Sequence, residues 1–255
     1  MREYTRIKYD HGQSLKGVAK HLLLRSGLEN LMYMRRHMLG MSTKHLEEGD
    51  MSRAFSDIYN DGVWTHGTGG AVLSGPGSTD QATSDLRVQL SQLLDEIHCQ
   101  RLVDIGCGDF NWMRHVKGSF DYLGLDVVPK LVESHNAVYG DATHHFLCMD
   151  AANSVLPEGD VALCREVLFH LSFRDVVKVL QNIKAAGFKY ILITSDKDVW
   201  FNSDIRSGDF RRLNMMKLPF RLPQPIGELV DEKVEHGRII GIWQGDTLPA
   251  EYHHH

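Results

Sequence analysis

The sequence predicts an α/β fold: a mostly parallel sheet with helices on both faces, preceded by a helical segment. Two patterns predict it. From about residue 80 onward, short apolar segments bounded by turn residues alternate with stretches of helical periodicity. A glycine turn, Gly106-Cys107-Gly108, follows the first of these apolar segments directly, and acidic residues end the next two. Strands joined by helical crossovers give a parallel sheet.

Residues 1–63 are predicted to form a separate N-terminal segment. Within it, 14–39 have apolar residues near a 3.6-residue period and are expected to be helical, whereas 41–62 resemble a charged, turn-rich connector. Residues 1–45 contain nine Lys or Arg and three acids, a net charge of +6 in a chain of net charge −5. Four roles are open for such a basic arm: packing on the acidic remainder of the chain, contact with an anionic partner, contact with a membrane surface, or a homodimer contact. With the glycine-rich loop 64–79, it is a candidate lid over a ligand.

Residues 64–252 are predicted to form the main domain. It begins with the loop 64–79 and a helix over 80–97 whose N-cap is Ser78 or Thr79. The clearest later helix covers Phe173–Ala186, and a late antiparallel strand pair is expected at Glu228–Val234 and Gly237–Gln244. Five strands of the parallel sheet are predicted at Arg101–Ile105, Tyr122–Leu125, His145–Met149, Val161–Cys164 and Tyr190–Thr194. Residues 253–255 (His-His-His) look like the remnant of a purification tag.

Composition narrows the classes of function. The four cysteines are spread singly, which argues against a zinc knuckle and a secreted disulfide framework. No run of about 18 apolar residues is present, so no transmembrane segment is expected. The first residues lack the apolar region of a signal peptide. The acidic body has no basic–aromatic nucleic-acid module. We therefore expect a cytoplasmic protein without a nucleic-acid partner.

A ligand site is predicted where the glycine turn and two acids converge. Glycines at 106 and 108 allow a tight turn and the close approach of a ligand. Asp126 ends the next strand, 20 residues after Gly106, where a carboxylate can accept hydrogen bonds from a ribose diol. Asp150 ends the third strand and can meet an adenine amine. The carboxyl ends of parallel strands share one crevice.

The segment Asp104–Asp109, DIGCGD, resembles the first motif of the class I S-adenosylmethionine-dependent methyltransferases. The resemblance covers about residues 74–245 and implies a Rossmann-like methyltransferase fold and S-adenosylmethionine as cofactor. In that superfamily the glycine turn faces the methionine part, the second-strand acid holds the ribose, and the third-strand acid faces the adenine. Carried over, this implies a cofactor site made by Asp104, Gly106, Cys107, Gly108, Asp126, Asp150 and Ala151.

The sequence departs at one position from the glycine fingerprint of proteins that bind nicotinamide dinucleotides. The third glycine of their fingerprint is replaced here by Asn111, which disfavours an NAD-dependent oxidoreductase.

Further segments resemble one branch of this superfamily, which contains bacterial sugar O-methyltransferases such as the mycobacterial enzymes of methylmannose polysaccharide biosynthesis. The resemblance rests on FSDIY (55–59), SGPGST (74–79), CGDFNWM (107–113), CREVLFHLS (164–172) and GDFRRLN (208–214). It implies O-methylation of a small sugar or oligosaccharide. Methylation of a non-sugar small molecule at O or N, and a non-catalytic cofactor-binding module, remain alternatives.

The catalytic candidates follow the fourth strand, where the acceptor lies in this superfamily. A sugar hydroxyl is a weak nucleophile, so a base is expected to take its proton. Glu166 and His170 are candidates, and His144, just before the third strand, is another.

Two groups are expected near the methionine carboxylate. The glycine loop at Gly75 can present backbone N–H groups, and Arg87 can offer a bidentate guanidinium. Arg165, next to Glu166, is assigned to the same cofactor site.

A metal and an aromatic wall are further expectations. Asp196 and Asp198 follow the fifth strand and can bind Mg²⁺ through oxygen ligands, with Glu166 contributing. Aromatic residues in predicted loops suit the apolar faces of a sugar. They are Tyr59, Trp64, Trp200, Phe201 and Phe210.

Overall fold

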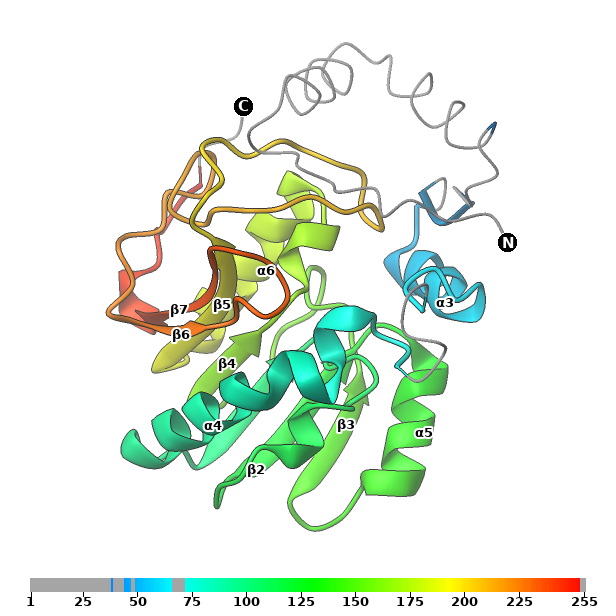
Figure 1. Ribbon diagram of the computed structural model, residues 1–255, viewed down its shortest axis with the longest axis vertical. Helices are drawn as coiled ribbons and strands as arrows, with labels where there is room; N and C mark the ends of the chain where they lie inside the picture. The colour runs from blue at the N-terminus through cyan, green and yellow to red at the C-terminus, as the bar shows by residue number, and fades with distance from the viewer. Residues whose placement is uncertain (1–37, 39–43, 47–48, 66–71, 253–255) are drawn as a thin grey trace.

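The computed structural model of the 255-residue chain describes residues 38, 44–46, 49–65 and 72–252 (Figure 1). Apart from Met38, the helix predicted over 14–39 lies outside the described residues, as does the tag remnant.

Seven strands form one sheet in the order β3-β2-β1-β4-β5-β7-β6. The first five are parallel, and β7 runs antiparallel to both β5 and β6. This confirms the predicted α/β fold and the late antiparallel pair, with strand ends shifted by a few residues. The strands are β1 (Arg101–Ile105), β2 (Asp121–Asp126), β3 (His144–Cys148), β4 (Val161–Cys164), β5 (Tyr190–Asp196), β6 (Gly227–Val230) and β7 (Arg238–Gln244).

Helices cover both faces of the sheet (Figure 1). Helix α4 (Asp80–Glu96) buries leucines at positions 86, 90 and 94 in an apolar cluster on one face of the sheet. Helix α5 (Pro129–Tyr139) contributes Val132 to the same cluster. Helix α6 (Phe173–Ala186) buries Val176, Leu180 and Ile183 in a second cluster. Thr79 caps α4, accepting from Ala82 N, and confirms the predicted start of that helix. With both faces covered, the central strands β4, β5 and β7 are buried almost throughout, whereas β3 and β6 at the two sides of the sheet are partly exposed.

Residues 51–60 form a helix, α3 (Met51–Asn60), where the sequence predicted a turn-rich connector; that prediction was wrong. Asp50 caps the helix by accepting from Arg53 N. Phe55 and Ile58 are buried in the same apolar cluster as α6. The helix is short, and tertiary packing of this face supplies the stability that its polar sequence does not indicate. Ser52 Oγ donates to Val127 O just after β2, which places α3 near the carboxyl ends of the strands.

A long segment, residues 197–226, joins β5 to β6 without regular secondary structure. It is tied to the carboxyl end of the sheet by backbone bonds, among them Asp196 N to Leu213 O (2.7 Å) and Arg211 N to Phe169 O (3.1 Å). Within the described residues, no helix combines the length and apolar character needed to cross a membrane.

Candidate functional site

A pocket that opens to solvent lies at the carboxyl ends of β1, β2 and β4; the space there, open solvent included, is about 900 Å³. The ends of neighbouring parallel strands meet at one edge, so residues far apart in sequence converge there. The predicted site residues in its wall are Gly106, Cys107, Gly108, Asp126, Ala151, Arg165, Glu166 and His170. The structure therefore brings the glycine turn, the second-strand acid and two catalytic candidates to one cavity.

Both glycines of the turn are required by its geometry. Gly106 and Gly108 have φ values of +72° and +57°, in the left-handed region that favours glycine. A Cβ on Gly106 would overlap the Val167 side chain, and one on Gly108 would lie 2.5 Å from Ser74 Oγ. The turn therefore has no room for a side chain at either position, and both glycines line the pocket.

Asp126 is fixed to this turn. Its Oδ2 accepts from Gly108 N and its Oδ1 from Val128 N, each at 3.0 Å. The residue is 6% exposed, and burial raises the pKa of its carboxyl while the backbone N–H groups oppose that rise. Asp126 lines the pocket, and a carboxylate has about four acceptor positions, so its backbone partners do not exhaust its capacity to accept hydrogen bonds.

Residues 72–78, here termed the strap, close one side of the pocket. Leu73 N and Ser74 N donate to Asp109 Oδ2 at 2.8 and 3.1 Å, and Asp109 N donates back to Ser74 Oγ at 2.8 Å. Farther along the strap, Asn111 Nδ2 donates to Ser78 O at 2.8 Å. Asn111, which replaces the third glycine of a dinucleotide fingerprint, is therefore an anchor of the strap.

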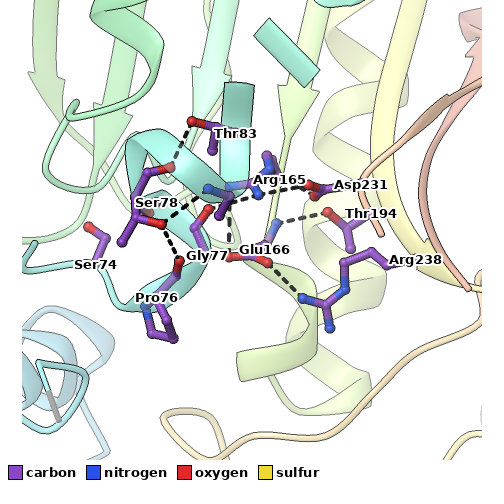
Figure 2. Close-up of polar contacts among 12 residues, drawn as sticks. Ser74, Pro76, Gly77, Ser78, Thr83, Arg165, Glu166, Thr194, Asp231 and Arg238 are labelled. Atoms are coloured by element: carbon purple, nitrogen blue, oxygen red, sulfur yellow. Dashed lines mark hydrogen bonds and ion pairs between the residues drawn. The ribbon is translucent and has the colours of Figure 1, made fainter. Parts of the chain in front are cut away.

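A buried charge network joins the strap to the end of the sheet (Figure 2). The Arg165 guanidinium donates from Nε and Nη2 to Asp231 at 3.0 and 3.1 Å, and from Nη2 to Gly77 O at 3.0 Å. The planar guanidinium of Arg165 also lies over the Trp112 ring, with its Cζ atom 5.0 Å from the ring centroid. Because Nε and Nη2 are engaged by Asp231 and by Gly77 O, Arg165 holds the strap in place. Fewer of its N–H groups are therefore left for the cofactor, to which the sequence assigned this residue.

Glu166 lies between two arginines. Its Oε1 accepts from Arg238 Nη1 at 2.7 Å, and its Oε2 is 3.7 Å from Arg165 Nη1. Burial raises the pKa of this carboxyl, but the two guanidinium groups outweigh it and hold the pKa below its usual value. Glu166 is therefore ionised at neutral pH, and both of its carboxylate oxygens already face a cation.

His170 has the protonation state that a base needs. Its Nδ1 lies 2.9 Å from Asp209 O, and because a carbonyl only accepts, Nδ1 carries the proton. Nε2 then holds a lone pair, and no hydrogen bond to it occurs within the part of the chain that is described. Burial lowers the pKa of His170 to about 4, so the ring is neutral at pH 7. The same shift also makes the ring a weak base, so the feature that distinguishes His170 from Glu166 is the geometry of its Nε2 lone pair.

Aromatic side chains surround this imidazole. The ring centroid of Trp64 is 4.7 Å from that of His170, with 33° between the planes, and Tyr59 meets Trp64 edge-on at 5.4 Å. Phe210 lies 5.6 Å from His170. Of the aromatic residues expected near a sugar, Trp64 and Tyr59 line the pocket, whereas Trp200 is 76% exposed on the surface.

Two predicted site residues lie elsewhere, and these expectations are corrected. His144 is the first residue of β3, so it lies at the amino ends of the parallel strands, whereas the pocket lies at their carboxyl ends. Its Nδ1 is 3.1 Å from Asp141 Oδ1. A residue that begins a parallel strand cannot reach the carboxyl edge. Arg87 pairs with Asp80 on its own helix at 3.2 Å and does not line the pocket.

Three further predicted residues adjoin the pocket without lining it. Asp104 points to the other side of β1, where Tyr122 OH donates to it at 2.8 Å. The Asp150 carboxylate accepts from Ala152 N at 2.9 Å and so shapes the turn that presents Ala151. Gly75, with φ of +92°, sits between the lining residues Ser74 and Ser78.

The magnesium expectation is not supported. Asp196 is fully buried and accepts from Arg238 Nε at 3.0 Å, with Arg212 Nε at 3.5 Å, so two cations already face it. Asp198 pairs with His236 at 2.8 Å. Across the described residues, no group of three or more His, Cys, Asp or Glu is arranged to hold a metal ion.

Sequence reasoning missed four residues that shape the site: Asp109, His135, Asp231 and Arg238. Asp109 carried a local signal, because it ends the DIGCGD motif. The others contact the site from α5, from just after β6 and from β7. Nothing in their local sequence indicates these long-range contacts.

Comparisons with known proteins agree with this architecture. Residues 103–186, about a third of the chain, match the family model described as a methyltransferase domain. No curated protein sequence matches the chain significantly. Among solved structures, the mitomycin 7-O-methyltransferase MmcR is 18% identical, with 79% of this chain and 66% of that chain covered and a TM-score of 0.51. The N-methyltransferase NodS from Bradyrhizobium japonicum WM9 is 13% identical, with 65% and 98% covered and a TM-score of 0.50. At such identities the likeness shows a shared fold.

Proposed function

We propose that this chain, of which residues 103–186 match a methyltransferase domain, transfers the methyl group of S-adenosylmethionine to a hydroxyl of a small sugar or oligosaccharide. The observation that carries the proposal is the meeting, in one pocket, of the glycine turn, Asp126 and a neutral His170. The four cysteines are free thiols, which suits the reducing cytoplasm where we place the protein.

The residues present fit this cofactor. Asp126 keeps acceptor positions for a ribose diol, and the Gly106–Gly108 backbone allows close approach. Met149 and Ala151 add a mainly apolar wall, suited to a purine. When bound, S-adenosylmethionine supplies an activated methyl group on a sulfonium.

His170 is the residue best placed to act as the base. Its Nδ1–H is held by Asp209 O, which fixes the ring and leaves the Nε2 lone pair for an acceptor hydroxyl. Glu166, paired with Arg238 and near Arg165, is better suited to holding the strap and the site in place. In this assignment the proton of the hydroxyl passes to His170 Nε2 as the oxygen attacks the methyl carbon.

A sugar acceptor is supported by the pocket wall and by sequence. Trp64 and Tyr59 offer aromatic faces beside His170, and such faces suit the apolar sides of a sugar ring. The segments 55–59 and 164–172, which resemble bacterial sugar O-methyltransferases, both contribute residues to the pocket.

The cofactor part is tested by titration calorimetry with S-adenosylhomocysteine, comparing wild type with Asp126→Ala. Loss of a carboxylate that receives ribose hydroxyls should weaken binding about tenfold or more. Asp121→Ala is the matched control, because Asp121 begins the same strand and is 49% exposed. Absence of binding by the wild type would remove the proposal.

The acceptor part requires an activity assay. Wild type is incubated with S-adenosylmethionine and a panel of methyl glycosides and short oligosaccharides, mannosides included, and S-adenosylhomocysteine release is followed. We expect turnover with a glycoside and none without acceptor. Turnover confined to amines or phenols, with cofactor binding intact, would redirect the proposal to a non-sugar substrate; binding without any turnover would indicate a cofactor-binding module.

A further inference from the structure

We propose that His135 is a positioning residue for the cofactor, acting through one hydrogen bond to the Gly108 carbonyl. This inference rests on the proposed cofactor, and it concerns a residue outside the pocket wall. His135 lies on α5 and is 4% exposed, and its Nε2 is 2.7 Å from Gly108 O. Since a carbonyl only accepts, Nε2 carries the proton and donates.

The imidazole has little freedom to leave this position. Phe146 lies with its ring centroid 5.1 Å from that of His135, and Tyr139 and Phe110 are at 5.9 and 6.2 Å. These rings belong to the apolar side of the sheet that α4 and α5 cover. A buried, packed donor aimed at a single carbonyl fixes that carbonyl more firmly than water would.

Gly108 is held on three sides, and His135 provides one of them. The Gly108 N–H donates to Asp126 Oδ2 at 3.0 Å, and its Cα faces Ser74 Oγ, which a Cβ would approach to 2.5 Å. The next peptide N–H, that of Asp109, donates to Ser74 Oγ at 2.8 Å. His135 therefore orients the same peptide group whose N–H anchors the strap.

Removing the donor would affect the ligand rather than the fold alone. Without His135, the Gly108 carbonyl would be a buried acceptor lacking its partner, and the peptide would turn to find another. That rotation moves Gly108, and Asp126, which is hydrogen-bonded to it, would lose its place in the pocket. Cofactor affinity should thus depend on a donor at position 135, and not only on an apolar filling residue.

The test is titration calorimetry with S-adenosylhomocysteine on four full-length proteins: wild type, His135→Phe, His135→Gln and Tyr139→Phe. Phenylalanine keeps a ring but removes the donor, whereas the glutamine side-chain amide donates from about the position of histidine Nε2. Tyr139→Phe is the control, because it changes a neighbour of His135 on the same helix and keeps the ring contact. Thermal unfolding of each protein reports on the fold separately.

We expect His135→Phe to weaken S-adenosylhomocysteine binding about tenfold, and His135→Gln and Tyr139→Phe to stay within about threefold of wild type. Equal weakening by Phe and Gln, or no weakening by Phe, would overturn the inference. If His135→Phe does not fold, His135→Asn replaces it, since its shorter side chain keeps an amide that cannot reach Gly108. A wild type that does not bind S-adenosylhomocysteine would instead refute the proposed function.

Discussion

Glu166 and His170 lie four residues apart, and their surroundings leave the first ionised and engaged by cations and the second neutral among aromatic rings. Glu166 has φ of +59°, a left-handed conformation stabilised by Glu166 N donating to Thr194 Oγ1 at 2.9 Å. That conformation brings its carboxylate to Arg238, which lowers its basicity. His170 faces aromatic rings, and burial keeps it neutral. At the scale of single residues, the choice of base is therefore made by the neighbours and not by the residue type.

His170→Gln is predicted to lower kcat/KM for the acceptor about 100-fold or more, because a positioned base contributes on that order to such a reaction. Affinity for S-adenosylhomocysteine should remain near that of wild type, since the glycine turn and Asp126 are untouched. Methyl-transfer assays with calorimetry on the same preparation check both parts. Retention of activity would assign the base elsewhere.

At the scale of elements, the strap acts as a preformed wall. Asp109, Asn111 and Arg165 each hold it with a hydrogen bond, and the three residues come from two different strand ends. Its glycine at position 77 lies against the Glu166 carboxylate, so closely that a Cβ there would overlap the carboxylate oxygens. The described part of the loop predicted as a flexible lid is thus pinned at several points.

Gly77→Ala should destabilise the protein by about 1–3 kcal/mol through overpacking, and should weaken S-adenosylhomocysteine binding because Ser74 and Ser78 on the same strap line the pocket. Chemical denaturation and calorimetry measure the two effects. Gly49→Ala is the control, since a Cβ there meets no atom of the described residues within 4 Å, and it should change stability by less than about 0.5 kcal/mol. Equal behaviour of the two variants would contradict a tightly packed strap.

At the scale of the whole molecule, residues outside the matched domain complete the site. Asp231 and Arg238 come from the antiparallel strand pair and its immediate end, beyond residues 103–186, and they fix Arg165 and Glu166 respectively.

The burial of a carboxyl group in β1, that of Asp104, opposes folding at neutral pH. Burial raises the pKa of Asp104 to about 7, despite the hydrogen bond from Tyr122.

That shift predicts how the free energy of unfolding depends on pH. Between the unfolded pKa of 3.8 and the folded pKa of about 7, the folded state holds the Asp104 proton and the unfolded state does not. Stability from this group is therefore greatest at low pH and is lost as pH rises through about 7. Asp104→Asn, which keeps an acceptor for Tyr122, should gain stability relative to wild type between pH 5 and pH 8.

Urea denaturation at several pH values measures this difference. Asp121→Asn serves as the control, because Asp121 is half exposed at the start of β2. A difference between Asp104→Asn and wild type that does not change with pH would show that Asp104 does not titrate in this range.

By itself, the sequence determined the alternating strands and helices, the glycine turn and the acid that ends β2. These features are encoded locally, by periodicity, by glycine and by position along the chain, so they can be read without the fold. Helix α3 was missed because its stability comes from burying Phe55 and Ile58.

Only the tertiary structure decided which charged side chains form pairs. Two contacts join residues that are 72 and 27 positions apart in the sequence: Glu166 with Arg238, and His135 with Gly108. The position of His144 outside the site follows from its place at the amino end of β3, away from the carboxyl ends of the strands. Their energies depend on burial, which no local pattern records.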